Sequence, residues 1–324
     1  MRFVVLGLGS IGRRHAANLM ALGQSVHGFD VVAGRRRAFE AGGGDAVVER
    51  DEALQLAADG GAVVVASPNG QHRDDVLDAL AAGSHVFVEK PFAHRLDGLQ
   101  AALARAQENG QIVFAAHNLR YHPAVDGARK ALADGALGRV LWARAICASY
   151  LPDWRPEQDY RTGYAADPRT GGVIFDVIHE FDLCAYLLGP FRAVWASAQR
   201  SGQLEIESED VADIRLEHEC GAATSLHFDY VTRPPIRVMD IAGSEGRIAI
   251  DIVGRRLTRW SPEGAVLTDE TAASRHEDDY RTEMEHFLAC VAEHATPRCN
   301  GLEALAVLSE VLAARAMAGL PAQD

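Results

Sequence analysis

Three groups of residues in this sequence have types and spacings that could do chemistry. The first is the loop Gly7-Leu8-Gly9-Ser10-Ile11-Gly12, which follows the apolar run 3–6 and opens a stretch with helical spacing. In a strand–loop–helix unit, the first glycine permits a tight turn, the second lets the backbone approach a pyrophosphate, and the third lets helix pack on strand. The free N–H groups at the start of the helix favour a bound anion. The loop therefore predicts a dinucleotide-binding site.

An acidic side chain follows at the end of the next expected strand. Asp30 comes 18 residues after Gly12, where a carboxylate accepts hydrogen bonds from ribose hydroxyls and repels a 2′-phosphate. This position favours NAD over NADP. Arg35, Arg36 and Arg37 lie shortly downstream and leave a 2′-phosphate open as an alternative, although such a run is more often a solvated helix face.

The second group is Glu89-Lys90-Pro91, directly after the apolar run 85–88. Doubly wound folds bind their ligands at the carboxyl ends of such strands. A lysine there could donate a hydrogen bond to a reacting oxygen. Taken alone, Lys90 would more often be a surface residue.

The third group lies in the segment 171–182. If this segment is helical, Asp176, His179 and Asp182 share one face. Histidine can take a hydroxyl proton near neutral pH, and a neighbouring carboxylate can orient the ring. Two alternatives stay open, namely a metal site made of these acidic residues and the histidine, and a buried histidine with a structural role. No further ligand group is evident, so we expect no metal.

The elements that must position these residues follow from the apolar patterning. Strand and helix signals alternate over the first third of the chain, which predicts a doubly wound parallel sheet of the Rossmann type. The expected strands are 3–6, 25–29, 62–66, 85–88 and 111–116, and the expected helices are 11–22, 74–82 and 96–109.

The pattern changes after about residue 120. Two helices, 124–133 and 176–188, precede and interrupt a series of strand-like stretches that suggests an antiparallel meander. These stretches are 139–148, 193–200, 211–217, 222–230, 236–242, 247–252 and 255–260, and helices are expected at 283–293 and 302–318. We therefore expect an α/β chain with two domains, a dinucleotide-binding domain over 1–119 and an α+β domain with a large, mainly antiparallel open sheet over 120–324. The C-terminal helix can pack back on the first domain.

Composition narrows the classes of partner. The chain has 324 residues and a formal net charge of −13, so nucleic acid and anionic membranes are poor candidates. No apolar stretch approaches the roughly 20 residues needed to span a bilayer. The five cysteines form no CxxC pair, which favours reduced thiols and a cytoplasmic location.

These motifs together resemble the glucose–fructose oxidoreductase, inositol dehydrogenase and rhizopine-catabolism (Gfo/Idh/MocA) family over essentially the whole chain. The resemblance rests on five ordered stretches: 7–15, Ser67-Pro68-Asn69-Gly70-Gln71-His72, Glu89-Lys90-Pro91, Asn118-Leu119-Arg120-Tyr121-His122-Pro123 and 171–182. It implies that Lys90 and His179 serve the reaction and that Asp176 assists. The family's usual spacing places this aspartate four residues before the histidine, whereas three separate them here.

The resemblance also implies which residues contact the cofactor and the substrate. The expected cofactor contacts are Gly7, Gly9, Ser10, Ile11, Gly12, Asp30, Ser67, Pro68, Asn69, His72, Glu89, Lys90 and Asn118. The stretches Trp154-Arg155-Pro156 and Asp159-Tyr160-Arg161 resemble a branch found among bacterial surface-sugar and amino-sugar biosynthesis enzymes. The expected substrate contacts are Lys90, Arg120, Trp154, Arg155, Tyr160, Arg161, Asp176 and His179, with His227 as a further candidate.

The resulting hypothesis is reversible hydride transfer between nicotinamide and a ring carbon of a sugar, amino-sugar, nucleotide-sugar or cyclitol. His179 would take the hydroxyl proton, Lys90 would polarise the oxygen, and Asp176 would orient His179. An NAD-dependent glycosidase that works by transient oxidation and elimination, and a sugar sensor without activity, are the alternatives. Apolar positions on both sides of the second sheet predict a homodimer or homotetramer formed through that sheet.

Overall fold

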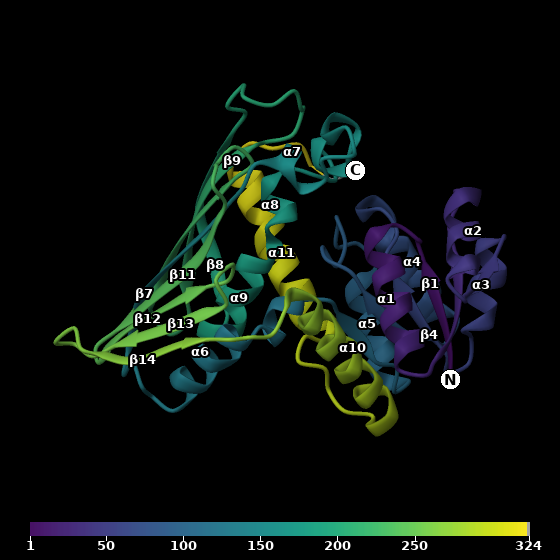
Figure 1. Cartoon of the computed structure of the whole chain (residues 1–324), viewed down its shortest axis with the longest axis horizontal. Helices are drawn as coiled ribbons and strands as arrows, with labels where there is room; N and C mark the ends of the chain where they lie inside the picture. Colours follow the sequence, from purple (N-terminus) through teal and green to yellow (C-terminus); the bar gives the residue numbers. More distant parts are fainter. Residues whose placement is uncertain (323–324) are drawn as a thin grey trace. The chain divides into compact units, whose positions relative to one another are not determined.

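The computed structural model describes residues 1–322 and divides into two compact units (Figure 1). The first unit contains Met1–Asn118 and Glu277–Leu308, and the second contains Leu119–His276 and the residues from Ser309 onward. Within the described part of the chain, no helix is long and apolar enough to cross a membrane.

The first unit is built on a six-stranded parallel sheet with the order β3-β2-β1-β4-β5-β6. Because the order reverses between β1 and β4, the loops after these strands diverge and leave room for a ligand at their carboxyl ends. The strands are β1 (Arg2–Leu6), β2 (Ser25–Phe29), β3 (Asp45–Val47), β4 (Ala62–Val65), β5 (His85–Val88) and β6 (Val113–Ala115).

The central strands β4 and β5 are buried along their whole length, as expected for a sheet with helices on both faces. The helices of this unit are α1 (Ser10–Ala21), α2 (Ala33–Ala41), α3 (Arg50–Leu56), α4 (His72–Ala81), α5 (Leu99–Glu108) and α10 (His276–Glu293), with the first half of α11 (Gly301–Met317). Phe87 of β5 stacks on Phe114 of β6, and both rings contact Phe287 of α10. The fold therefore recruits a C-terminal helix to the core beside β5.

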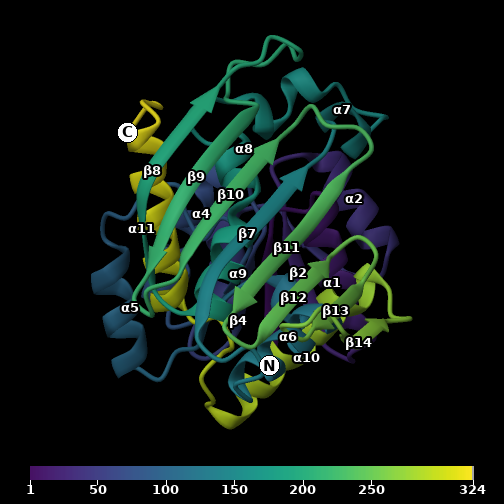
Figure 2. The ribbon, with the colours of Figure 1, turned by 90° about the vertical axis from the view of Figure 1, so that its left-hand side faces the viewer.

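The second unit is built on an eight-stranded sheet with the order β14-β13-β12-β11-β7-β10-β9-β8, seen face-on in Figure 2. Neighbouring strands are antiparallel except for β7 and β10, which are parallel. The strands are β7 (Val140–Ala148), β8 (Phe191–Gln199), β9 (Val211–His218), β10 (Ala223–Asp229), β11 (Ile236–Gly243), β12 (Gly246–Asp251), β13 (Arg256–Trp260) and β14 (Val266–Thr271).

Helices pack on one face of this sheet, and the other face is open in Figure 2. The helices are α6 (Pro123–Ala133), α7 (Leu151–Trp154), α8 (Val173–Asp176), α9 (Ile178–Leu188) and the second half of α11. Phe181 of α9 contacts Phe228 of β10, so even-numbered side chains of β10 face the helices and odd-numbered ones face away.

The predicted fold class is confirmed, and three of its details differ. The strands do not form one meander, because β7 lies between β11 and β10. The elements α2, β3, α3 and β14 were not predicted from the sequence. The expected helix from 176 to 188 is two helices, since Val177 has φ −96° and ψ 25° and separates α8 from α9.

Candidate active site

The glycine loop joins β1 to α1 with little free space around two of its three glycines. Gly7 has φ +92°, and a Cβ there would lie 2.4 Å from the carbonyl oxygen of Ala66. A Cβ on Gly12 would lie 1.9 Å from the carbonyl oxygen of Gly7. A Cβ on Gly9 would meet no atom of residues 1–322 within 4 Å. The loop is therefore closed on the protein side and open at the start of α1, where a pyrophosphate would bind.

The carboxylate of Asp30 fixes this loop from the end of β2. Its Oδ2 accepts a hydrogen bond from the N–H of Leu8 at 2.8 Å, and its Oδ1 accepts one from the N–H of Val32 at 2.8 Å. Arg35 also reaches Oδ2, at 3.2 Å. A carboxylate oxygen can accept more than one hydrogen bond, so Asp30 can hold the loop and still accept from a ribose hydroxyl.

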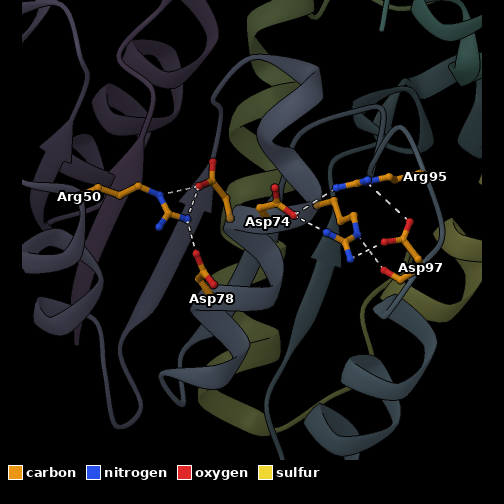
Figure 3. Close-up of polar contacts among 7 residues, drawn as sticks. Arg50, Asp74, Asp78, Arg95 and Asp97 are labelled. Atoms are coloured by element: carbon orange, nitrogen blue, oxygen red, sulfur yellow. Dashed lines mark hydrogen bonds and ion pairs between the residues drawn. The ribbon is translucent and has the colours of Figure 1, made fainter. Parts of the chain in front are cut away.

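A pocket beside Asp30 extends the site toward β4 and α4. Its lining includes Arg35, which the sequence linked to a possible 2′-phosphate, and side chains that the sequence did not single out for the cofactor: Phe29, Val31, Arg50, Gln71 and Asp75. Arg50, the first residue of α3, donates to Asp75 and to Asp78 of α4 (Figure 3). Burial by itself would lower the pKa of Arg50, but the hydrogen bonds and charges of the two carboxylates raise it above the ordinary value. Ser67 donates to the other oxygen of Asp75 at 2.6 Å. The predicted contacts Ser67 and Pro68 line the same pocket.

A second cluster on α4 is a surface feature. Figure 3 shows Asp74 and Asp97 with Arg95, and Arg73 pairs with both carboxylates. Asp74 and Asp97 are more than half exposed. Exposed pairs of this kind contribute about 0–1 kcal/mol each, so we assign the cluster no role in the site.

Lys90 follows β5 at the same edge of the sheet. It is one of only two lysines in the chain, which has thirty arginines. An ammonium group can change its protonation state far more readily than a guanidinium, and of the two lysines Lys90 is the one that stands at this edge. Asn118, after β6, is buried, and its Nδ2 has no hydrogen-bond partner within the described chain. A buried amide donor without a partner in the described chain can donate a hydrogen bond to a polar ligand.

These observations fit a dinucleotide. The open position at Gly9, the buried carboxylate of Asp30, and the amide of Asn118 offer a phosphate site, a ribose acceptor and a further donor. Of the other predicted contacts, His72 lies behind the loops, with its two ring nitrogens 2.7 Å from the Pro91 oxygen and 2.8 Å from the Ser67 oxygen. Glu89 is also buried, against His15.

In the second unit, His179 stands near the start of α9, and two carboxylates that have their own partners follow it in the chain, Glu180 directly and Asp182 three residues later. Glu180 receives two hydrogen bonds from Arg237 of β11, the shorter at 2.6 Å. Asp182 receives hydrogen bonds from Arg120, the shortest at 2.6 Å, and both groups are buried. The two pairs fix α9, and Arg120 is thus placed as a support of the helix.

Asp176 is the last residue of α8, and the phenol of Tyr230 donates to its Oδ2 at 2.5 Å. Tyr230 is fully buried, and burial beside Asp176 raises its pKa well above the ordinary value. The ring of Trp154 contacts Tyr230 edge-on. Tyr230 therefore links the loop of the expected substrate contacts to α8, and nothing in the sequence pattern identified it.

Three of the predicted substrate contacts surround one small pocket. Trp154, Arg155 and Tyr160 line it together with Leu151, Gln158, Asp159, Gly163, Tyr164 and Ala165. Arg161 is outside this lining and pairs with Asp159 and Glu205 on the surface. His227 lies on the face of the sheet opposite to α9, between Asp213 and Asp229, and we do not carry it into the site.

A buried ion pair between Glu209 and Arg315 supports α8. The Glu209 carboxylate accepts from the N–H of Ile174 at 3.2 Å and from Arg315 of α11 at 3.1 Å. Arg315 also donates to the Pro168 oxygen at 2.9 Å, and its guanidinium lies over the Phe175 ring. Burial, which outweighs the neighbouring Arg315, raises the pKa of Glu209 to about 7.

Comparison with known proteins assigns both units. Residues 1–117 match the model of an oxidoreductase family with an NAD-binding Rossmann fold, GFO_IDH_MocA, and residues 125–249 match the C-terminal domain of the same family. The chain belongs to the Gfo/Idh/MocA family. The resemblance inferred from its motifs is thereby confirmed.

Relatives within the family act on different compounds. The chain is 29% identical to a 1,5-anhydro-D-fructose reductase from Ensifer adhaerens, over 78% of this chain and 75% of that one. It is 28% identical to a 2,7-anhydro-N-acetylneuraminate hydratase from Mediterraneibacter gnavus, over 75% of this chain and 65% of that one. The solved structure of a UDP-N-acetylglucosamine 3-dehydrogenase from Acidithiobacillus ferrooxidans has 25% sequence identity and a TM-score of 0.79. The match covers 98% of this chain and 97% of that one.

The predictions of an NAD-dependent oxidoreductase and of NAD as its cofactor are confirmed by these findings. The roles of the individual site residues remain predictions.

The raised pKa of Glu209 makes the second unit less stable as the pH rises. In the unfolded chain this carboxyl has an ordinary pKa of 4.5, whereas in the folded chain it is about 7. Between these values the folded state binds the extra proton, so stability falls with increasing pH across this window. We expect Glu209→Gln to remove on the order of 2–3 kcal/mol of that dependence, measured by urea unfolding at pH 5 and pH 8.

Glu207→Gln is the matched control, since Glu207 lies two residues before Glu209, is exposed and pairs with Arg200. The control should keep the pH dependence of the unmodified chain. An unchanged dependence in Glu209→Gln would contradict the assignment.

Proposed function

We propose that the chain oxidises a ring hydroxyl of a sugar, amino-sugar, nucleotide-sugar or cyclitol, and reduces the corresponding ketone in the reverse direction. The observation that carries this proposal is an NAD-binding unit with Lys90 at the carboxyl end of β5, joined in one chain to a unit with His179 on α9. When bound, NAD supplies a hydride acceptor at nicotinamide C4, and the oxidised carbon becomes a carbonyl.

His179 is proposed as the group that takes the hydroxyl proton. An imidazole changes protonation state near neutral pH, so it can accept the proton in oxidation and return it in reduction. The Arg237–Glu180 and Arg120–Asp182 pairs hold the start of α9, one and three residues after His179. Asp176 is proposed to orient His179, and Tyr230 holds its carboxylate.

Lys90 is proposed to donate a hydrogen bond to the reacting oxygen. A cation there stabilises the negative charge that develops as the proton leaves. The remaining substrate contacts would come from the pocket of Trp154, Arg155 and Tyr160. An indole and a phenol offer flat apolar faces with one polar edge each, which suits a sugar ring, and Arg155 suits a carboxylate or phosphate on it.

A substrate panel tests the proposed reaction. The purified chain with NAD is mixed with simple sugars, uronic acids, nucleotide-sugars and inositols, and NADH absorbance is followed. At least one member should produce NADH, and His179→Ala and Lys90→Met should each lower kcat by about 10²–10⁴-fold.

His294→Asn is the matched control, because His294 is exposed just beyond the end of α10, lies outside the residues assigned to the site, and has a left-handed backbone that Asn tolerates. It should keep its kcat within about twofold of the unmodified chain, as expected for a surface change. Full turnover by His179→Ala at neutral pH would show that the base is misassigned.

A second candidate activity uses the cofactor without net oxidation. One relative is a hydratase of an anhydro sugar acid, and transient oxidation followed by elimination would also suit an NAD-dependent glycosidase. In the same panel, consumption of an anhydro sugar or glycoside without accumulation of NADH would favour this candidate.

The open face of the eight-stranded sheet is proposed to bind a second copy of the chain, giving a homodimer or homotetramer. Trp142 of β7 and Trp195 of β8 are 43% and 54% exposed on this face. Arg144 and Arg215 stand beside them in register. Large apolar side chains among charged ones are typical of a surface that is covered in an assembly.

Light scattering after size exclusion tests this assembly. The unmodified chain should elute as a dimer or tetramer, and Trp142→Glu should reduce the assembled fraction at micromolar concentration. Leu302→Glu changes an exposed leucine at the start of α11 and serves as the control. A monomer at every concentration would contradict the proposal.

The cytoplasm is the proposed location, supported by the absence of a CxxC pair among the five cysteines of the sequence. Fractionation of the producing cells tests it, and recovery outside the cytoplasmic fraction would contradict it.

A further inference from the structure

A buried histidine–carboxylate pair lies directly behind Lys90. The Nε2 atom of His15, in α1, is 2.6 Å from Oε1 of Glu89, and the His15 side chain is fully buried. Burial by itself would raise the pKa of Glu89, but the hydrogen bond and charge of His15, together with Lys90, hold it below the ordinary value. Glu89 is therefore held as an anion in the interior by the first turns of the helix that carries the glycine loop.

The second oxygen of Glu89 reaches the backbone of the lysine. Oε2 accepts a hydrogen bond from the N–H of Lys90 at 3.1 Å. The His15 ring is itself fixed by edge contacts with Phe87 of β5 and Tyr280 of α10. A rigid chain of contacts thus runs from α1 through Glu89 to the peptide that carries the Lys90 side chain.

The other flank of Lys90 is held by His72. One ring nitrogen of His72 lies 2.7 Å from the oxygen of Pro91 and the other lies 2.8 Å from the oxygen of Ser67. His72 is buried at the start of α4. The loops after β4 and β5 are therefore tied together immediately beyond the lysine.

We propose that His15, acting through Glu89, is the positioning residue for Lys90, and that it couples the dinucleotide loop to the lysine so that both keep one geometry. His72 holds the segment from the other side of Lys90, through its contacts with the Pro91 and Ser67 oxygens. The inference rests on the proposed role of Lys90 in polarising the substrate oxygen. A displacement of about 1 Å at such a group can cost about 10²-fold in rate, so a support without contact to substrate would still affect kcat.

The acetylation rate of Lys90 measures how firmly its segment is held, and the measurement needs no turnover. Because the chain has only Lys90 and Lys130, acetylation by sulfo-NHS-acetate followed by mass spectrometry compares one site with one internal reference, the exposed Lys130. In His15→Phe, Lys90 should be acetylated at least about threefold faster relative to Lys130, since a loosened segment opens more often.

His85→Phe is the matched control. His85 is buried at the opposite end of the same strand and accepts a hydrogen bond from the N–H of Ile112. The His85→Phe variant therefore loses a comparable contact without a change in the Lys90 loop. Its ratio of Lys90 to Lys130 acetylation should match that of the unmodified chain. His15→Gln keeps a donor for Glu89 and should restore the ratio; if His15→Phe does not fold, Glu89→Gln takes its place.

Kinetics with the panel compound that reduces NAD separates positioning from general damage. His15→Phe should lower kcat about 10- to 100-fold, with the dissociation constant for NADH, read from fluorescence, within about threefold of the unmodified value. Adding Glu89→Gln to His15→Phe should lower kcat by less than about a further twofold, because both changes break the same contact. An unchanged labelling ratio and kcat in His15→Phe, while Lys90→Met is inactive, would overturn the inference; an active Lys90→Met would instead overturn the proposed role of Lys90.

Discussion

All strands of the six-stranded sheet run in one direction, and the first unit depends on this constraint. Parallel strands end at a common edge, so the residues that follow β1, β2, β4 and β5 meet there although up to about eighty positions separate them in the sequence. The glycine loop, Asp30, Ser67 and Lys90 are these residues. Their side chains need no long loops to approach one another, because hydrogen-bonded strands already hold the backbone in place.

Two carboxylates buried at this edge each have a hydrogen-bond partner. Asp30 accepts from the N–H of Leu8, and Glu89 pairs with His15. In the second unit the same rule holds for Asp182 with Arg120 and for Glu209 with Arg315. A buried pair stabilises little by itself, but loss of one partner leaves the other charge desolvated at a cost of about 3–5 kcal/mol. Such pairs therefore fix geometry more than they add stability, which is what a site for proton and hydride transfer requires.

The sequence predicted the first unit well for a local reason. The apolar run 3–6, the glycines and the helical spacing after them lie within about twenty residues, so the chemistry and its scaffold are readable together. The region 33–56 escaped prediction because Arg35 to Arg37 and Gly42 to Gly44 mask the short α2, β3 and α3.

The second unit could be predicted only in outline. The strands were found from alternation, but the place of β7 between β11 and β10 is a long-range pairing with no local signature. The helix before the break at Val177 contacts Glu209 and Tyr230, which are distant in sequence from α8. For the same reason the partners of Arg120 and Arg161 could not be foreseen, although the residues themselves were noticed.

In the proposed reaction a hydrogen leaves a ring carbon of the substrate as hydride and is retained on NADH. The direct measurement uses the panel compound that reduces NAD, deuterated at its ring carbons, with NMR of the NADH that forms. We predict one deuterium at nicotinamide C4 and a ketone in place of one ring hydroxyl. Unlabelled NADH, or a converted substrate without net NADH, would contradict the account.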